Sequence, residues 1–255
     1  MREISHLDPR YTEFMYLFAD YTQEQVDAPD DISDFYFNDI LEDENINDVY
    51  ERVAKPCKRT LLHSFIANLL NGSHQYIIKK AAELECDRFS RLISHVELQA
   101  PPWLNEDEVG DHKEELRKLC HAAITRITPT VFHLLFSDRN FLFKFQQRVA
   151  TYIRTPEFQQ HPQFLLNDGV VKRISRQPSW LKRAVFFRDQ GRCQLCSGEI
   201  SGLNSPNISV HLDHMVPLAA GGSNDPTNFQ LTCDHCNTSK GKKVIVAPAR
   251  FEPYW

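Results

Sequence analysis

The chain has 255 residues, 42% hydrophobic and 25% charged, with a formal net charge of −5. This length allows about two domains with apolar cores, and the composition is ordinary for a soluble globular protein. No apolar run approaches the roughly 18–20 residues that span a bilayer, and no signal-peptide stretch follows the polar start. These features predict a cytoplasmic protein that has no membrane partner.

Charge is distributed unevenly along the chain. Residues 173–255 contain 10 Lys or Arg and 6 Asp or Glu, whereas residues 1–172 contain 19 and 28. A basic module on an acidic chain favours one end that binds a polyanion and one end that binds a partner or regulates. Two ordinary solvated surfaces are the alternative interpretation.

The acidic excess is concentrated in residues 11–51, which contain 13 acidic residues and no Lys or Arg. The segment also contains apolar and aromatic residues, among them Phe14, Phe18, Phe37 and Leu41. Acidic segments that lack such anchors are typical of disorder, so this one is expected to fold or dock. It could mimic DNA and cover the basic end, dock a partner, or form a solvated helical face.

Helical periodicity dominates residues 1–155, which we predict to form a mostly α-helical accessory or partner-binding domain. Apolar residues recur at helical spacing in residues 61–70, 116–127 and 141–153, and residues 76–96 are a further candidate helix. A linker is predicted at residues 156–176, and a smaller α+β domain at residues 177–255.

The C-terminal domain is predicted to begin with a helix over residues 180–190. Ser179 is the expected N-cap, and Leu181 and Val185 would form the apolar face. Three arginines lie along this helix or directly after it and are candidates to bind nucleic acid: Arg183, Arg188 and Arg192.

Two cysteine pairs follow the helix: Cys193 with Cys196, and Cys233 with Cys236. Paired CxxC motifs are typical of a tetrahedral structural zinc site with four thiolate ligands. The residues between the pairs, 197–232, outnumber the roughly 15–20 of a plain zinc ribbon, so additional structure is expected there. The remaining cysteines are expected to be reduced thiols: Cys57, Cys86 and Cys120.

Polar residues suited to hydrolysis lie between the two cysteine pairs and just after the second pair. Asp213 and His214 are adjacent, Gly221-Gly222 marks a turn, and Asn228 and Asn237 follow. A carboxylate binds hard divalent cations through oxygen, and an imidazole can accept a proton near neutral pH. A bare zinc knuckle that only binds nucleic acid would not require this set.

Residues 180–243 resemble the HNH endonuclease family, whose ββα-metal fold has the same order of parts. The carrying motifs are an arginine-bearing helix, CxxC, Val210-His211-Leu212-Asp213-His214, Gly221-Gly222, Asn228-Phe229-Gln230-Leu231, CxxC and Asn237-Thr238-Ser239-Lys240. The resemblance implies a ββα finger held by a four-cysteine zinc site, attached to the mostly α N-terminal domain.

The resemblance also implies a role for each residue. His214 would be the general base, Asp213 and Asn237 would bind Mg²⁺ or Mn²⁺, and Asn228 would brace the loop and orient His214. Three lysines would contact phosphates: Lys240, Lys242 and Lys243.

These expectations favour a metal-dependent HNH endonuclease that cuts DNA. Its setting could be a phage-defence system, with an ATPase or sensor docked on the helical half, or restriction. The alternative is a catalytically silent DNA-binding module within a larger complex. One protomer would nick, so double-strand cleavage would require a homodimer or two events. If the acidic segment opposes DNA binding, a chain starting near Gln177 would nick more readily than the full chain.

Overall fold

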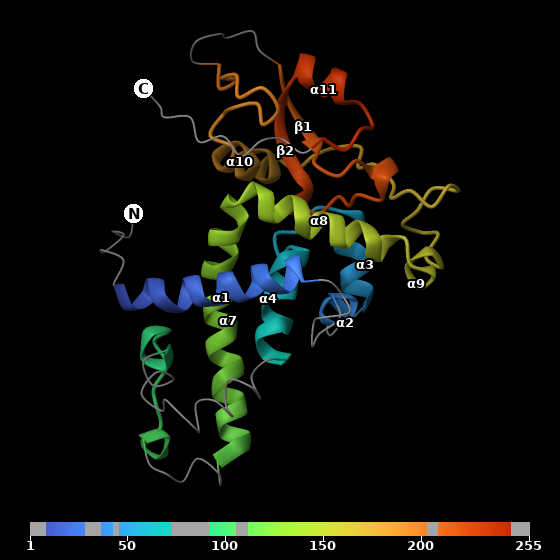
Figure 1. Cartoon of the computed structure of the whole chain (residues 1–255). Coiled ribbons are helices and arrows are strands. Elements are labelled where there is room, and N and C mark those ends of the chain that lie inside the picture. The colour runs from blue at the N-terminus through green and yellow to red at the C-terminus, as the bar shows by residue number, and fades with distance from the viewer. Residues whose placement is uncertain are drawn as a thin grey trace. The chain divides into compact units, whose positions relative to one another are not determined.

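The computed structural model describes residues 9–28, 37–42, 46–72, 92–105, 112–202 and 209–245. The chain forms two compact units, each assembled from two stretches of sequence (Figure 1). Unit 1 comprises Met1–Tyr36 and Leu62–Leu135, and unit 2 comprises Phe37–Leu61 and Phe136–Trp255.

Unit 1 is helical, as its periodicity predicts. Its described helices are α1 (Pro9–Asp27), α4 (Leu61–Gly72, which begins at the unit boundary), the 3-10 helix η1 (Pro102–Asn105) and most of α7 (Lys113–Ser137). The apolar residues that predicted α4 are fully buried, and those that predicted α7 are mostly buried. Of the candidate helix at residues 76–96, residues 73–91 lie outside the described part of the chain, and residues 92–95 are helical.

Helix α7 is long and apolar enough to cross a membrane by length and composition. Buried core helices of soluble proteins meet the same criterion, so this is weak evidence of a membrane span. Nine of its residues are buried in the fold, including Leu116, Ile124 and Val131. The sequence-based prediction that no segment is long enough is therefore qualified for this one helix.

Part of the acidic segment packs into the core of unit 2. Helices α2 (Phe37–Glu42) and α3 (Ile46–Ala54) belong to this unit, together with α8 (Arg139–Ile153) and α9 (Pro156–Gln159). The Phe37 ring lies 5.7 Å from that of Phe145, and the Tyr50 ring lies 5.0 Å from that of Phe158. These edge-on aromatic contacts anchor α2 and α3 in the core of unit 2, so the part of the acidic segment that these helices contain is not a detachable cover.

The division of the chain differs from the one predicted at residues 155 and 177. The expected linker, residues 156–176, contains α9 and a β-bridge between Leu165 and Val171, and both lie within unit 2. Thr155 caps α9 by accepting a hydrogen bond from the Phe158 amide. Sequence patterns missed this because short helices and single bridges have no measurable period.

The C-terminal part of unit 2 forms the expected ββα finger (Figure 1). Helix α10 (Ser179–Arg188) precedes strands β1 (Val210–His214) and β2 (Phe229–Cys233), and α11 (Asp234–Lys240) follows. The strands pair antiparallel, with Asp213 opposite Gln230 and His214 opposite Phe229. Two 3-10 turns, η3 (Leu218–Ala220) and η4 (Pro226–Asn228), connect them. Ser179 begins α10 rather than capping it, because Pro178 occupies the N-cap position.

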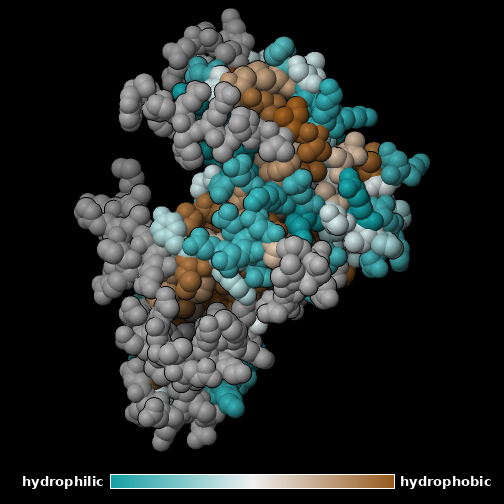
Figure 2. All heavy atoms as spheres, viewed as in Figure 1, coloured by the Kyte–Doolittle hydropathy of each residue, from teal (hydrophilic) through white to brown (hydrophobic). Residues whose placement is uncertain are grey.

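A small core holds the finger together. Its buried members are Leu181, Val185, Cys193, Ile200, Phe229 and Leu231. Polar and apolar residues are interspersed on the face drawn in Figure 2, and large apolar side chains exposed in unit 2 include Phe187, Val210 and Val244. The predicted combination of a mostly α-helical N-terminal region and a small α+β finger is confirmed.

Candidate active site and zinc centre

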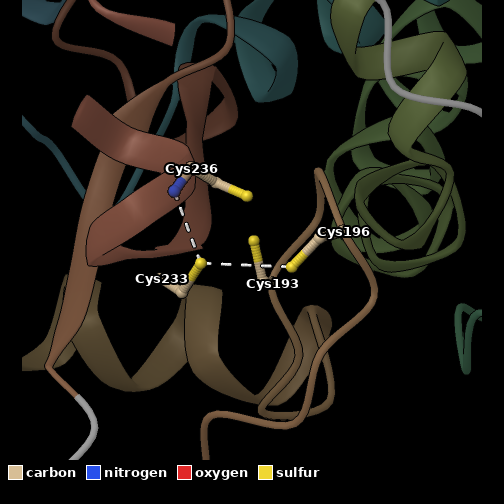
Figure 3. Close-up of side chains that lie close together, drawn as sticks. All are labelled: Cys193, Cys196, Cys233 and Cys236. Carbon is tan, nitrogen blue, oxygen red and sulfur yellow. Dashed lines mark hydrogen bonds between the residues drawn. The ribbon is translucent and has the colours of Figure 1, made fainter. Parts of the chain in front are cut away.

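The four predicted zinc ligands converge on one point. The Sγ atoms of Cys193, Cys196, Cys233 and Cys236 all lie within 4.8 Å of one another (Figure 3). Zinc–thiolate bonds of about 2.3 Å give a tetrahedron whose edges measure about 3.8 Å. The sulfur cluster is therefore close to the size that a zinc ion requires, and the donor set fits this metal.

The protein environment shifts the pKa values of these thiols in different directions. Burial raises the pKa of Cys196 and of Cys236, whereas the pKa of Cys193 is lowered because main-chain hydrogen bonds to its sulfur outweigh its burial. The Cys233 Sγ caps α11 by accepting a hydrogen bond from the Cys236 amide at 3.4 Å. A bound zinc ion would stabilise the thiolates that burial disfavours, and it would tie α11 to the loop before β1.

Asp213 is held by two donors that both bind the same carboxylate oxygen. Gln230 Nε2 donates to Asp213 Oδ2 at 2.9 Å, and Lys240 Nζ lies 2.9 Å from this oxygen. The Lys240 side chain is fully buried and also donates to the His214 carbonyl oxygen at 2.7 Å. The prediction that Lys240 contacts phosphate is wrong, because its buried ammonium group is bound to Asp213 and to the His214 carbonyl oxygen.

Gln230 is in turn oriented from outside the finger. Arg139, at the start of α8, donates from Nη2 to Gln230 Oε1 at 2.5 Å. A guanidinium group only donates, so it fixes the amide with its oxygen towards Arg139 and its nitrogen towards Asp213. Sequence patterns indicated no role for either residue, although Gln230 faces Asp213 once the hairpin register is known.

His214 ends β1 as a buried imidazole. Its ring lies 4.5 Å from that of Phe229, and its Nε2 lies 3.1 Å from Asn224 Oδ1. Burial lowers the pKa of His214 from its ordinary 6.5 to about 4. The imidazole is therefore neutral at pH 7, which is the protonation state that a general base needs.

Asn228 ties the loop after His214 to the start of β2. Its side chain accepts a hydrogen bond from the Val216 amide and donates to the carbonyl oxygens of Val216 and Ser223. Its own carbonyl oxygen accepts from the Met215 amide at 2.7 Å. These bonds match the expected brace. The side-chain contact to His214 comes from Asn224, however, and not from Asn228.

The same loop is bound to the helices of unit 2 by a buried polar network. Gln146 of α8 accepts from the Ser223 hydroxyl and donates to Thr227 Oγ1, and the Thr227 hydroxyl donates to Asp225. Asp225 also accepts from the Leu61 amide at 2.8 Å. Every member of the network is paired, so the network makes the loop rigid.

Three of the four candidate catalytic residues line one pocket of about 710 Å³, a volume within the range of ordinary ligand sites, and Asn228 does not. Asp213, His214 and Asn237 all contribute to its wall. Three basic residues line it as well: Arg173, Lys182 and Lys242. Lys242 was predicted, whereas Arg173 and Lys182 were not. Arg173 was missed because it falls in the segment taken for a linker.

The other basic residues predicted to bind nucleic acid do not line this pocket. The Arg188 side chain is 2% exposed, pairs with Asp189 and donates to the Phe229 carbonyl oxygen, so it supports the fold. Arg192 is half-buried and donates to the Ser197 carbonyl oxygen beside the zinc cluster. Arg183 and Lys243 are exposed outside the residues that line the pocket.

Comparison with known families agrees with this geometry. The model of the HNH endonuclease family matches residues 193–243, so this part of the chain is an HNH domain. Such a domain implies a nuclease-type or nucleic-acid-binding function, with DNA as the substrate. The comparisons with curated proteins and with solved structures gave no match.

Proposed function

We propose that the protein is a metal-dependent endonuclease that hydrolyses phosphodiester bonds in DNA. One observation carries this proposal: Asp213, His214 and Asn237 line a single pocket whose wall also includes Arg173, Lys182 and Lys242. The silent DNA-binding alternative does not account for a neutral, oriented histidine beside a carboxylate at the base of that pocket. Plasmid nicking by the full chain with and without Mg²⁺ or Mn²⁺ tests the proposal.

Asp213 and Asn237 are the residues that would hold the catalytic cation. The bonds from Gln230 and Lys240 both go to Asp213 Oδ2, which leaves Oδ1 for a metal ion. A carboxylate and an amide oxygen form a hard donor set, which suits Mg²⁺ or Mn²⁺. When bound, the ion would supply positive charge beside the scissile phosphate.

The protein side of the reaction centres on His214. The neutral imidazole accepts a proton from a water molecule as the water oxygen attacks phosphorus. The bond between phosphorus and the 3′-oxygen breaks, and this oxygen takes a proton from solvent. The products are a 5′-phosphate and a 3′-hydroxyl, and the imidazolium returns its proton to water. Lys240 and Gln230 keep the Asp213 carboxylate in place throughout.

Arg173, Lys182 and Lys242 would bind the phosphates that flank the scissile bond. All three are exposed cations on the wall of the pocket and come from three separate segments of the chain. Phosphate contacts of this kind supply most non-specific affinity for DNA and fix the register of the duplex.

Lys182→Ala is expected to weaken DNA binding uniformly across sequences, because it removes one phosphate contact. The slope of log K against log salt concentration should fall by about 1. Fluorescence anisotropy across a salt series measures this slope. Arg183→Ala is the matched control, since Arg183 is the next residue, equally exposed and outside the pocket wall. Equal slopes for Lys182→Ala and the unmodified protein would contradict the assignment.

The acidic segment suggested a biological setting: a phage-defence or restriction role, with an ATPase or sensor bound to the helical half. Residues 37–42 and 46–51 of that segment now have a structural role within unit 2. The remaining support for a docked partner comes from α1, on which Tyr16 and Leu17 are 51% and 44% exposed. We place the protein in the cytoplasm on the composition of its sequence.

A further inference from the structure

Asn224 is fully buried between His214 and two main-chain carbonyl groups. Its Nδ2 donates to the Ala54 carbonyl oxygen at 2.9 Å and to the Lys172 carbonyl oxygen at 2.7 Å. Its own amide donates to the Val53 carbonyl oxygen at 2.8 Å. Its Oδ1 lies 3.1 Å from His214 Nε2. Every polar atom of this side chain therefore has a defined partner.

These partners fix which way the amide points. A carbonyl oxygen can only accept a hydrogen bond, so the side of the amide that faces Ala54 and Lys172 must be the NH₂ group. Both protons of that group are used by the two carbonyls. The oxygen must then face His214, and an oxygen that bears no proton requires a donor opposite it. His214 Nε2 is consequently the nitrogen that carries the proton.

We propose that Asn224 is a positioning residue that locks His214 in its Nε2–H tautomer and so makes Nδ1 the proton-accepting nitrogen. A neutral imidazole has one donor and one acceptor nitrogen, so fixing the first determines the second. The inference rests on the proposed role of His214 as the general base. It gives Asn224, rather than Asn228, the task of orienting that base.

The proposal makes helix α3 part of the catalytic apparatus. Val53 and Ala54 end α3, and Lys172 lies beyond α9; all three fall outside the segment that matches the HNH family. Their carbonyl oxygens have fixed positions because Tyr50 and Val53 are buried in unit 2. Helix α3, which begins within the acidic segment and ends just after it, therefore supports the general base through its main-chain carbonyl groups.

The first test reads the tautomer directly in the zinc-loaded full chain. Nitrogen-15 NMR at pH 7.5 on histidine-labelled protein distinguishes a protonated Nε2 from a protonated Nδ1, and the His214 signals are assigned by their loss in His214→Gln. We expect Nε2 to carry the proton. A protonated Nδ1 would overturn the proposal. This readout does not depend on cleavage, so it decides the role of Asn224 even if the protein cuts no DNA.

The second test removes the side chain. Asn224→Ala should shift His214 towards the other tautomer and lower the kcat of plasmid nicking about 10- to 100-fold, with KM unchanged. Thr232→Val is the matched control, because Thr232 is equally buried on β2 and its hydroxyl has no partner among the described residues. The His214 tautomer and the kcat of Thr232→Val should match those of the unmodified protein. If Asn224→Ala retains zinc and helical content, an unchanged tautomer or kcat would refute the proposal. If Asn224→Ala loses zinc or helical content, the His214 tautomer measured in the unmodified protein decides whether the proposal holds.

Discussion

Replacing His214 with alanine is expected to slow plasmid nicking by about 10²- to 10⁴-fold, the usual contribution of a general base. The physical reason is that a buried amide oxygen orients the His214 ring beside Asp213, whereas the other histidine of the pocket wall, His211, lies 3.3 Å from the exposed carboxylate of Asp234. The rate of conversion of supercoiled to open-circular plasmid measures the effect. DNA affinity should change little, because phosphate binding depends on the basic residues of the pocket wall.

His235→Ala provides the comparison for this substitution. His235 is exposed on α11 and lies outside the residues that line the pocket. It should retain the rate of the unmodified protein, and both variants should retain zinc and helical content. Nicking by His214→Ala at close to the unmodified rate would remove His214 from the mechanism.

Loss of one zinc ligand is expected to unfold the HNH finger. Cys233 caps α11, ends β2 and would bind the zinc ion, so Cys233→Ser disrupts all three roles. Apparent zinc-binding free energies in small zinc-finger peptides are roughly 10–16 kcal/mol, comparable to the whole stability of a typical domain. We expect Cys233→Ser protein to contain no zinc and to show loss of structure in circular dichroism and proteolysis.

Cys57→Ser separates this effect from the general loss of a thiol. Cys57 is half-buried, and its sulfur is not part of the four-cysteine cluster. That variant should contain one zinc per chain and unfold at the temperature of the unmodified protein. Elemental analysis that finds no zinc in active, unmodified protein would contradict the structural role of the cluster.

The finger was predictable because its determinants are local and chemically specific. Each motif can be recognised within a few consecutive residues: the CxxC pairs, the adjacent Asp213 and His214, and the Gly221-Gly222 turn. A side chain at Gly222 would collide with the Val216 carbonyl oxygen, so this position requires glycine. The helices at residues 61–70, 116–127 and 141–153 were predictable because a long apolar repeat has a measurable period.

The contacts that complete the site were not predictable, because they join distant segments. Asn224 and Ala54 are 170 residues apart, and Arg139 and Gln230 are 91 residues apart. The burial of Lys240 and Arg188 was also hidden, since charged residues are ordinarily exposed and a sequence does not reveal their buried partners. Lys240 and Arg188 were each predicted to bind DNA, whereas both form bonds that stabilise the fold.

These long-range bonds reverse one expectation about truncation. A chain that begins near Gln177 lacks the Ala54 and Lys172 carbonyls, the Leu61 amide and Gln146, all of which bind the loop of residues 223–227. Exchanging each of these hydrogen bonds for one to water costs about 0.5–1.5 kcal/mol and leaves the loop without the partners that position it. The truncated chain is therefore expected to be less active than the full chain, and not more.

Cleavage of plasmid by the full, zinc-loaded chain is the direct test of metal-dependent endonuclease activity. Purified protein is incubated with supercoiled plasmid in Mg²⁺ or Mn²⁺, and in parallel with neither ion after brief treatment with a chelator that leaves the zinc content at one per chain. We predict open-circular product with 5′-phosphate ends only when Mg²⁺ or Mn²⁺ is present. Protein that binds the plasmid and contains zinc, yet cuts with neither ion, would contradict endonuclease activity and favour a catalytically silent DNA-binding module.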